Sequence, residues 1–182
     1  MFMEDIGGGI WKALVAAPMM LVGLSLAAYA NDFSGEHSYH YQRAVQMPVA
    51  VGDEPTVVAG ATKGIFRNNA GDGSFLHGVA VECTQSWSNT AAWDVAEDET
   101  TATFDGVGHC VFTDWDNDQA ILWWRGVWLA GTAVDYRWEW TGGTGKYQGI
   151  TGSGQLEDLG YTEHVQGVES GVIKITGTWE IP

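Results

Sequence analysis

Residues 134–154 decide the fold: Val-Asp-Tyr-Arg-Trp-Glu-Trp (134–140), then Thr-Gly-Gly-Thr-Gly-Lys-Tyr-Gln-Gly-Ile-Thr-Gly-Ser-Gly (141–154). In the first half, aromatic residues at 136, 138 and 140 alternate with charged residues at 135, 137 and 139. This alternation is the period of a half-buried antiparallel strand. The glycines of the second half permit positive φ angles and close backbone approach. We therefore predict a strand that ends in a tight corner, after which a new strand leaves at a sharp angle.

Other segments of the chain are also rich in β-branched and aromatic residues, and turn residues separate them. These predicted strands are 36–47, 56–67, 75–87, 101–113, 119–129 and 171–181. The first of them places His37, Tyr39, Tyr41 and Arg43 on one side. The pair 101–113 and 119–129 is predicted to form a hairpin with 114–118 at its tip. Strands with short connections favour an all-β fold, a single antiparallel barrel of about eight strands, because closure removes exposed edges. A β-sandwich is the alternative.

Composition excludes some partners. The chain of 182 residues carries a formal net charge of −15 and only eight lysines and arginines. A nucleic-acid partner needs a basic face that neutralises phosphates, so no nucleic-acid binding is expected. Short acidic runs, among them 156–158, are interpreted as solvated loops.

The first thirty residues predict export. Residues 13–30 are apolar or small and end in Ala28-Tyr29-Ala30, which matches the cleavage pattern of a signal peptide. The run of about 18 residues is also the lower limit for a membrane helix, so membrane attachment through a retained helix at 8–30 stays open. We divide the chain into 1–30, a signal peptide or hydrophobic anchor helix, and 31–182, the barrel domain. The expected location is periplasmic or extracellular.

Two motifs carry a resemblance to known proteins. Thr141–Gly154 resembles the Gly-Gly-Thr-Gly-Lys-Phe/Tyr segment of the allene oxide cyclase and dirigent-like barrel superfamily. Cys110-Val-Phe-Thr-Asp-Trp-Asp-Asn-Asp118 is similar to a Cys-Val-Phe/Tyr-Thr-Asp-x-Asp-Gly-Asp motif of small exported bacterial proteins of unassigned role. The resemblance implies an eight-stranded barrel with a central cavity. In that superfamily the barrel encloses an apolar substrate or guides the coupling of phenolic radicals, and uses no metal or organic cofactor. The superfamily's cyclase residues have no matching positions here, so no activity is carried over.

Cys83 and Cys110 are the only cysteines, and each falls within a predicted strand. In an oxidising compartment they predict a disulfide that joins two strands. A redox or metal role needs closer spacing or further ligands.

The residues with catalytic chemistry are few. His77, on the predicted strand 75–87, shares a face with Cys83 and would act on a ligand if that face is inward. Glu82 and Glu139 are candidates for a carboxylate in the cavity. The sequence contains no nucleophile elbow or phosphate loop, so no catalytic residue is assigned.

Asp114, Asp116 and Asp118 imitate the start of a calcium loop. Position six of that loop is Gln119 instead of glycine and position twelve is Arg125 instead of glutamate, so an EF-hand is excluded. A solvated turn is the preferred interpretation, and weak calcium binding is the alternative. No cofactor is expected.

Aromatic residues on consecutive strands carry the most functional information. The candidate binding or interface residues are Trp115, Trp123, Trp124, Trp128, Tyr136, Trp138 and Trp140. The predicted strand 119–129 has tryptophan on both faces, and one lumen cannot bury both. The surplus predicts an aromatic pocket or an outer aromatic patch.

Two functions follow. In the first, a non-catalytic barrel outside the cytoplasm docks its aromatic surface on a larger assembly, so the partner is a protein. In the second, a hollow barrel binds or isomerises a small apolar or aromatic compound, as a cofactor-free enzyme of the superfamily's kind.

Overall fold

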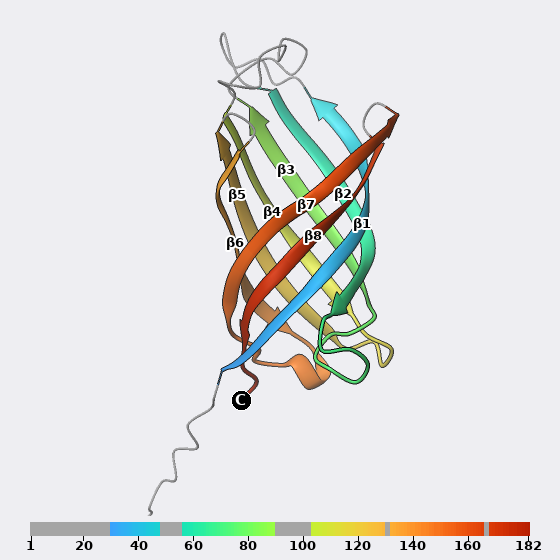
Figure 1. Cartoon of the computed structure of the whole chain (residues 1–182), viewed down its shortest axis with the longest axis vertical. Coiled ribbons are helices and arrows are strands. Elements are labelled where there is room, and N and C mark those ends of the chain that lie inside the picture. Colours follow the sequence, from blue (N-terminus) through green and yellow to red (C-terminus); the bar gives the residue numbers. More distant parts are fainter. Residues whose placement is uncertain (1–29, 48–55, 90–102, 130–131, 166–167) are drawn as a thin grey trace, which may run out of the picture.

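The computed structural model describes residues 30–47, 56–89, 103–129, 132–165 and 168–182. They form one closed barrel in which every strand is antiparallel to its neighbours, in the order β1 to β8 (Figure 1). The strands are β1 (Asn31–Met47), β2 (Thr56–Asn68), β3 (Val79–Asn89), β4 (Thr103–Thr113), β5 (Gln119–Leu129), β6 (Thr132–Gly143), β7 (Ser153–Val165) and β8 (Val168–Trp179). A single 3-10 turn, η1 (Gly145–Tyr147), precedes β7.

The predicted antiparallel barrel is confirmed, and the sandwich alternative is wrong because β1 pairs with β8 and closes the sheet. The predicted N-terminal helix lies outside the described residues. Within the described ranges, no helix is long and apolar enough to cross a membrane.

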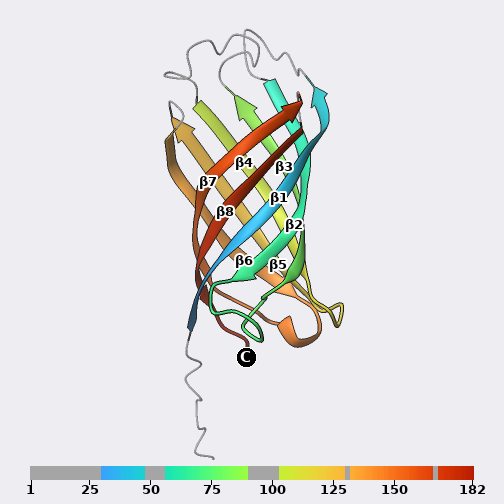
Figure 2. The ribbon, with the colours of Figure 1, turned by 45° about the vertical axis from the view of Figure 1, so that its right-hand side comes forward.

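The corner predicted at 141–154 lies at the lower end of the barrel in Figures 1 and 2, which we define by the connections at 69–78, 114–118 and 144–152. The inward residues of β6 before this corner are the predicted ones: Tyr136, Trp138 and Trp140 are all buried. Trp138 shows why glycine is needed. Its indole lies against Gly177, which pairs directly with Gly154, and its Nε1 donates to the Thr176 carbonyl over 3.2 Å.

Aromatic side chains fill the lower half of the lumen. Phe33 contacts both Trp138 and Trp140, and Phe75 stacks on Trp179 with 4.2 Å between ring centroids. Edge-to-face and stacked pairs of this kind add to the stabilisation from burial alone. Tyr147 of η1 is also buried, so the lower end is closed by protein.

The pairing of β6 with β7 is much shorter than that of the other neighbours. It runs only from Arg137 opposite Gln155 to Glu139 opposite Ser153. Beyond Gln155, the described pairing of β7 is with β8 alone. The wall of the upper half is therefore held together less tightly on the β6–β7 side than elsewhere.

The predicted disulfide is confirmed. Cys83 on β3 and Cys110 on β4 are directly opposite each other and are bonded, and both are buried on the inner face. Such a bond is consistent with an oxidising compartment.

Candidate functional site

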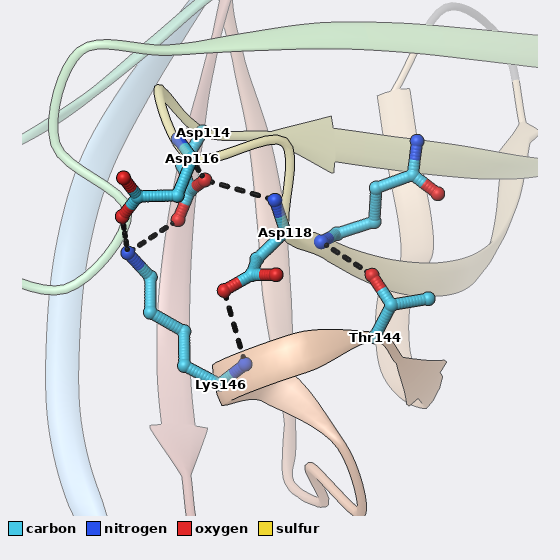
Figure 3. Close-up of polar contacts among 6 residues, drawn as sticks. Asp114, Asp116, Asp118, Thr144 and Lys146 are labelled. Atoms are coloured by element: carbon cyan, nitrogen blue, oxygen red, sulfur yellow. Dashed lines mark hydrogen bonds and ion pairs between the residues drawn. The ribbon is translucent and has the colours of Figure 1, made fainter.

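The two motifs of the sequence meet at the lower end, where the turn of Asp114–Asp118 holds Lys146 of η1 (Figure 3). Lys146 Nζ lies 2.6 Å from Asp114 Oδ2 and 3.0 Å from Asp116 Oδ2, and its backbone N–H donates to Asp118 Oδ2. The first of these is an ion pair whose angles fall outside those of a hydrogen bond. Thr144 completes the contact, because its Oγ1 accepts from the Gln119 N–H. We call these residues the lower clasp.

The lower clasp bears on the calcium interpretation. The three carboxylates converge on Lys146: Asp114 and Asp116 contact its ammonium, and Asp118 accepts a hydrogen bond from its backbone N–H. Burial favours the neutral form of Asp114, but the ion pair with Lys146 and the hydrogen bond from the Asp116 backbone prevail and lower its pKa. The same contacts raise the pKa of Lys146. Among the described residues, no group of three or more histidine, cysteine or acidic side chains is placed to hold a metal.

Lys146→Met is expected to lower the free energy of unfolding by about 1–3 kcal/mol, because the Asp114 side chain, only 6% exposed, loses its counter-charge. Denaturant unfolding followed by tryptophan fluorescence measures this. The matched control is Lys174→Met, whose pair with Glu157 is exposed and should cost less than about 1 kcal/mol. Equal losses in the two variants would contradict a stabilising clasp.

The three catalytic candidates are not brought together. The prediction that His77 lies on a strand is wrong: β3 begins at Val79, and His77 lies in the lower connection, with Nδ1 2.9 Å from the Asn68 carbonyl and Nε2 3.2 Å from Asp72. Glu82 and Glu139 are both exposed, Glu82 in an ion pair with Lys63. Glu139 alternates with the buried Trp138 and Trp140, so it faces outward. None of the three reaches the lumen.

The aromatic candidates divide between two places. Trp115, in the lower clasp, is 89% exposed, and Trp123 lies on the outer face opposite Glu139. The other five, namely Trp124, Trp128, Tyr136, Trp138 and Trp140, face the lumen. Of the seven candidates, only Trp115 and Trp123 are therefore placed for an outer aromatic patch. Tryptophan on both faces of β5 is confirmed, with Trp123 outside and Trp124 inside.

Four aromatic residues line one side of the upper lumen, and we call them the aromatic band: Trp87, Trp124, Trp128 and Tyr136. Ring centroids are 5.0 Å apart for Trp87 and Trp128, and 4.7 Å apart for Trp128 and Tyr136. Glycine makes this possible, because a Cβ at Gly126 would overlap the Trp128 ring. The Trp87 and Trp128 rings are only partly buried, so the band has a surface that a ligand can reach.

Asp158 on β7 faces this band. It lies directly opposite Ile173, which packs against the core, and its carboxylate lies beside the Trp128 side chain. Burial raises the pKa of Asp158, and the contact with Trp128 opposes this only in part. Asp158 nevertheless remains exposed to solvent. Protein therefore does not fully enclose Asp158, which lies on the inner face of β7.

Two tyrosines are coupled to this carboxylate. Tyr39 on β1 lies across Gly171 of β8. Burial raises the pKa of Tyr39 first, and the charges of Asp158 and Glu169 raise it further. Burial and the Asp158 charge likewise raise the pKa of Tyr136. Both phenols are therefore neutral hydrogen-bonding groups at physiological pH.

His37 faces the same lumen from β1. It is opposite Phe66 on one side and Ile173 on the other, it is 4% exposed, and it stacks on Tyr39 at 5.8 Å. Its ring lies near the Ile65 backbone, but neither nitrogen has a hydrogen-bond partner of proper geometry among the described residues. Burial lowers the pKa of His37 to about 4. The imidazole is therefore neutral. We call the aromatic band together with Asp158, Tyr39 and His37 the lumen site.

Acid is expected to weaken the fold through His37. Because its pKa is about 4 when folded and 6.5 when unfolded, the unfolded chain binds more protons between these values, and stability falls as the pH drops from about 6.5 towards 4. The full loss is about 3 kcal/mol.

His37→Phe keeps the ring, so its free energy of unfolding should vary less between pH 7 and pH 4 than that of the unchanged protein. The control, His109→Phe, changes an exposed residue of β4 and should leave the acid dependence as it is. An acid dependence that His37→Phe does not reduce would contradict a buried neutral imidazole.

An open groove of about 750 Å³ lies elsewhere, at the lower end between the first residues of β1, the last residues of β8 and the connection at 69–78. Its lining combines the aromatic residues Phe33, Phe75 and Trp179 with small polar residues. It contains no residue of the lumen site.

The sequence missed most of the lumen site. The sequence predicts a solvated acidic loop around Asp158, but Asp158 lies within β7, where its neighbour Glu157 pairs outward with Lys174. The predicted common face of His37 and Tyr39 on one strand is confirmed. The sequence carries one signal for Asp158. It lies two residues after the apolar Leu156, so on a strand the two side chains share a face.

The fold and this site define a class, an antiparallel eight-stranded barrel whose lower half is filled by aromatic side chains and whose upper half carries an inward carboxylate, Asp158, beside aromatic rings. In comparisons with known proteins, no family model, no curated protein and no solved structure matches the chain.

Proposed function

We propose that this protein is an exported barrel that binds a small organic molecule in its upper lumen, against the aromatic band. The supporting observation is Asp158, which faces inward opposite Ile173, lies beside the Trp128 side chain and is exposed to solvent. A charged side chain on the inner face adds no apolar packing, so its presence there favours a ligand-binding role over a packing role. The interior of an eight-stranded barrel is either filled by side chains or holds one small ligand.

Two further points support the proposal. The resemblance to the allene oxide cyclase and dirigent-like superfamily favours a barrel with an occupied cavity. The disulfide is consistent with a location outside the cytoplasm. Neither point assigns a reaction, and the proposal is one of binding.

A neutral dye tests the proposal. The emission of 6-propionyl-2-(dimethylamino)naphthalene moves to the blue in apolar surroundings, and we expect a saturable shift with one site per chain. Trp128→Leu should weaken binding about tenfold through the lost aromatic contact. The control, Trp115→Leu, changes an exposed indole far from the lumen and should have no effect. No saturable shift, or equal weakening in both variants, would overturn the proposal.

A second candidate function, docking on a protein partner, is supported by one observation. Trp115 is 89% exposed on a turn held in place by hydrogen bonds from the Asp116 and Asp118 N–H groups to Asp114 Oδ1. A rigid exposed tryptophan is typical of an interface hot spot. For this candidate Trp115→Leu is the test and Trp128→Leu is the control. In native extracts, Trp115→Leu should release the protein from a larger complex, and Trp128→Leu should not.

A further inference from the structure

We infer that the groove at the lower end of the barrel is a second binding site, and that its ligand is a neutral saccharide. The groove of about 750 Å³ shares no residue with the lumen site, so the two sites are independent. Small-molecule sites have volumes of about 300–1,000 Å³, and the mouth of a β-barrel is a common place for them. The chemistry of the lining selects the ligand class.

Aromatic surface forms one part of the lining. Phe75 and Trp179 stack with their ring planes 7° apart, and both are only partly buried, so ring surface of each is exposed. Phe33 lies beside Phe75, with 5.5 Å between the ring centroids, and completes the aromatic lining. The face of an aromatic ring carries partial negative charge. The C–H groups on one face of a sugar ring are weak donors that pack against such surfaces.

Hydrogen-bonding groups form the rest of the lining. They are asparagine, serine and threonine side chains, among them Ser34, Asn69 and Thr178, and Asp32 is the one charged side chain among the described residues that line the groove. Hydroxyl and amide groups both donate and accept, as each sugar hydroxyl does. A hydrocarbon would displace water from these groups without replacing its hydrogen bonds. The lining therefore matches a polyol with an apolar face.

Hydrogen bonds hold the polar wall in place. Asn69 donates from its backbone N–H to the Ser34 carbonyl over 2.8 Å and from Nδ2 to Ser34 Oγ over 3.2 Å. Asn68 is 5% exposed, and it donates to the Phe75 carbonyl and accepts from the Ala70 N–H. These contacts tie the loop after β2 to β1. A wall that is already fixed loses less conformational entropy when a ligand binds.

One donor packed against the aromatic lining has no partner. Trp140 contacts both Phe33 and Phe75, and its Nε1 is buried without a hydrogen-bond partner among the described residues. A buried N–H group of this kind requires an acceptor. An oxygen-rich ligand, together with the water that it orders, brings acceptors to this end of the barrel, whereas a hydrocarbon brings none.

Calorimetry with the whole protein tests this, using neutral trisaccharides as probes: cellotriose, maltotriose, mannotriose and triacetylchitotriose. We expect saturable binding of at least one of them. Cyclohexanol, a six-membered ring with a single hydroxyl, should bind about tenfold more weakly or not at all, because it lacks the other hydroxyl groups. If none of the sugars binds, or if cyclohexanol binds as tightly as the best sugar, the saccharide assignment is overturned and the proposed function of the upper lumen still stands.

Indole N–H resonances of ¹⁵N-labelled protein show where the sugar binds. We expect the Trp179 signal to move and saturate with the sugar, while the signals of Trp87, Trp124 and Trp128 in the upper lumen stay in place. The reverse pattern would place the sugar in the lumen site and overturn the second site.

Two substitutions tie binding to the groove. Trp179→Leu removes aromatic surface and should weaken sugar binding about tenfold, whereas the control Trp115→Leu, which changes an exposed indole outside the lining, should have no effect. Thr178→Val keeps the shape and removes one hydroxyl, so binding should weaken about threefold to tenfold. Its control is Thr162→Val, an exposed threonine of β7.

Circular dichroism checks that each variant folds. If Trp179→Leu does not fold, Thr178→Val and the Trp179 resonance still decide. Sugar binding that Thr178→Val leaves unchanged, or that test and control variants weaken equally, would overturn the assignment of the groove.

Discussion

Gly154→Ala is expected to destabilise the barrel by more than about 3 kcal/mol, or to prevent folding altogether. A Cβ at this position would overlap the Thr176 carbonyl oxygen and lie 2.7 Å from the Gly177 Cα. These are backbone atoms of the paired strand β8, so they cannot turn aside as a side chain can. The indole of Trp138 rests on the same glycine pair, and any separation of β7 from β8 would disturb it.

Denaturant unfolding, followed by tryptophan fluorescence, measures the effect of Gly154→Ala. The control is Ser153→Ala, an exposed neighbour on the same strand that should change stability by no more than about 0.5 kcal/mol. A Gly154→Ala variant within about 1 kcal/mol of the unchanged protein would show that β7 and β8 are not packed as closely as described.

Removing the disulfide is the second large effect. The double substitution Cys83→Ala and Cys110→Ala is expected to cost about 3–4 kcal/mol, because the bond closes a loop with a sequence separation of 27 and so restricts the unfolded chain. Both cysteines are buried on the inner face, and alanine leaves no unpaired polar group there.

Reduction provides the control. Dithiothreitol should lower the unfolding midpoint of the unchanged protein to about that of the double variant and leave the double variant unaffected. A double variant as stable as the oxidised protein, or one that is still sensitive to dithiothreitol, would contradict a stabilising role of Cys83–Cys110.

The sequence predicts the barrel because its strongest signals are local. The alternation before Trp140 and the glycines after it describe a strand and its corner without knowledge of the neighbours. Closure of β1 on β8 follows from the number of strands and the need to cover edges. The start of β3 was misplaced because Phe75 and Leu76, which look like strand residues, instead close the lower end of the lumen.

Which face of each strand points into the lumen is harder to predict from the sequence. Periodicity assigns Trp123 and Trp124 to opposite faces, but it does not say which face is inward. The inward set becomes clear only when each strand is paired with its neighbours, as when Gly106 and Gly126 are seen to make room for the Trp87 and Trp128 rings. A count of tryptophans predicts no function by itself, because three of those that the structure describes, Trp124, Trp138 and Trp140, are buried in the core.

The lower clasp and the lumen site are also hard to predict, because each depends on contacts between residues far apart in the sequence. The acidic turn at 114–118 and Lys146 were each noted, but only the folded chain brings them together. Asp158 appeared as one more charge in an acidic protein. Its importance depends on β7 turning this residue inward beside Trp128, a contact between residues 30 positions apart in the sequence.

The central claim is that the upper lumen, and not the outer surface, receives a ligand. The direct measurement is the set of indole N–H resonances in ¹⁵N-labelled protein during a titration with 6-propionyl-2-(dimethylamino)naphthalene, assigned by single tryptophan-to-phenylalanine substitutions. Our account predicts that the signals of Trp87, Trp124 and Trp128 move together and saturate, while those of Trp138 and Trp140 in the packed lower half stay in place. Signals that move only for the outer Trp115 and Trp123, or that do not move at all, would contradict it.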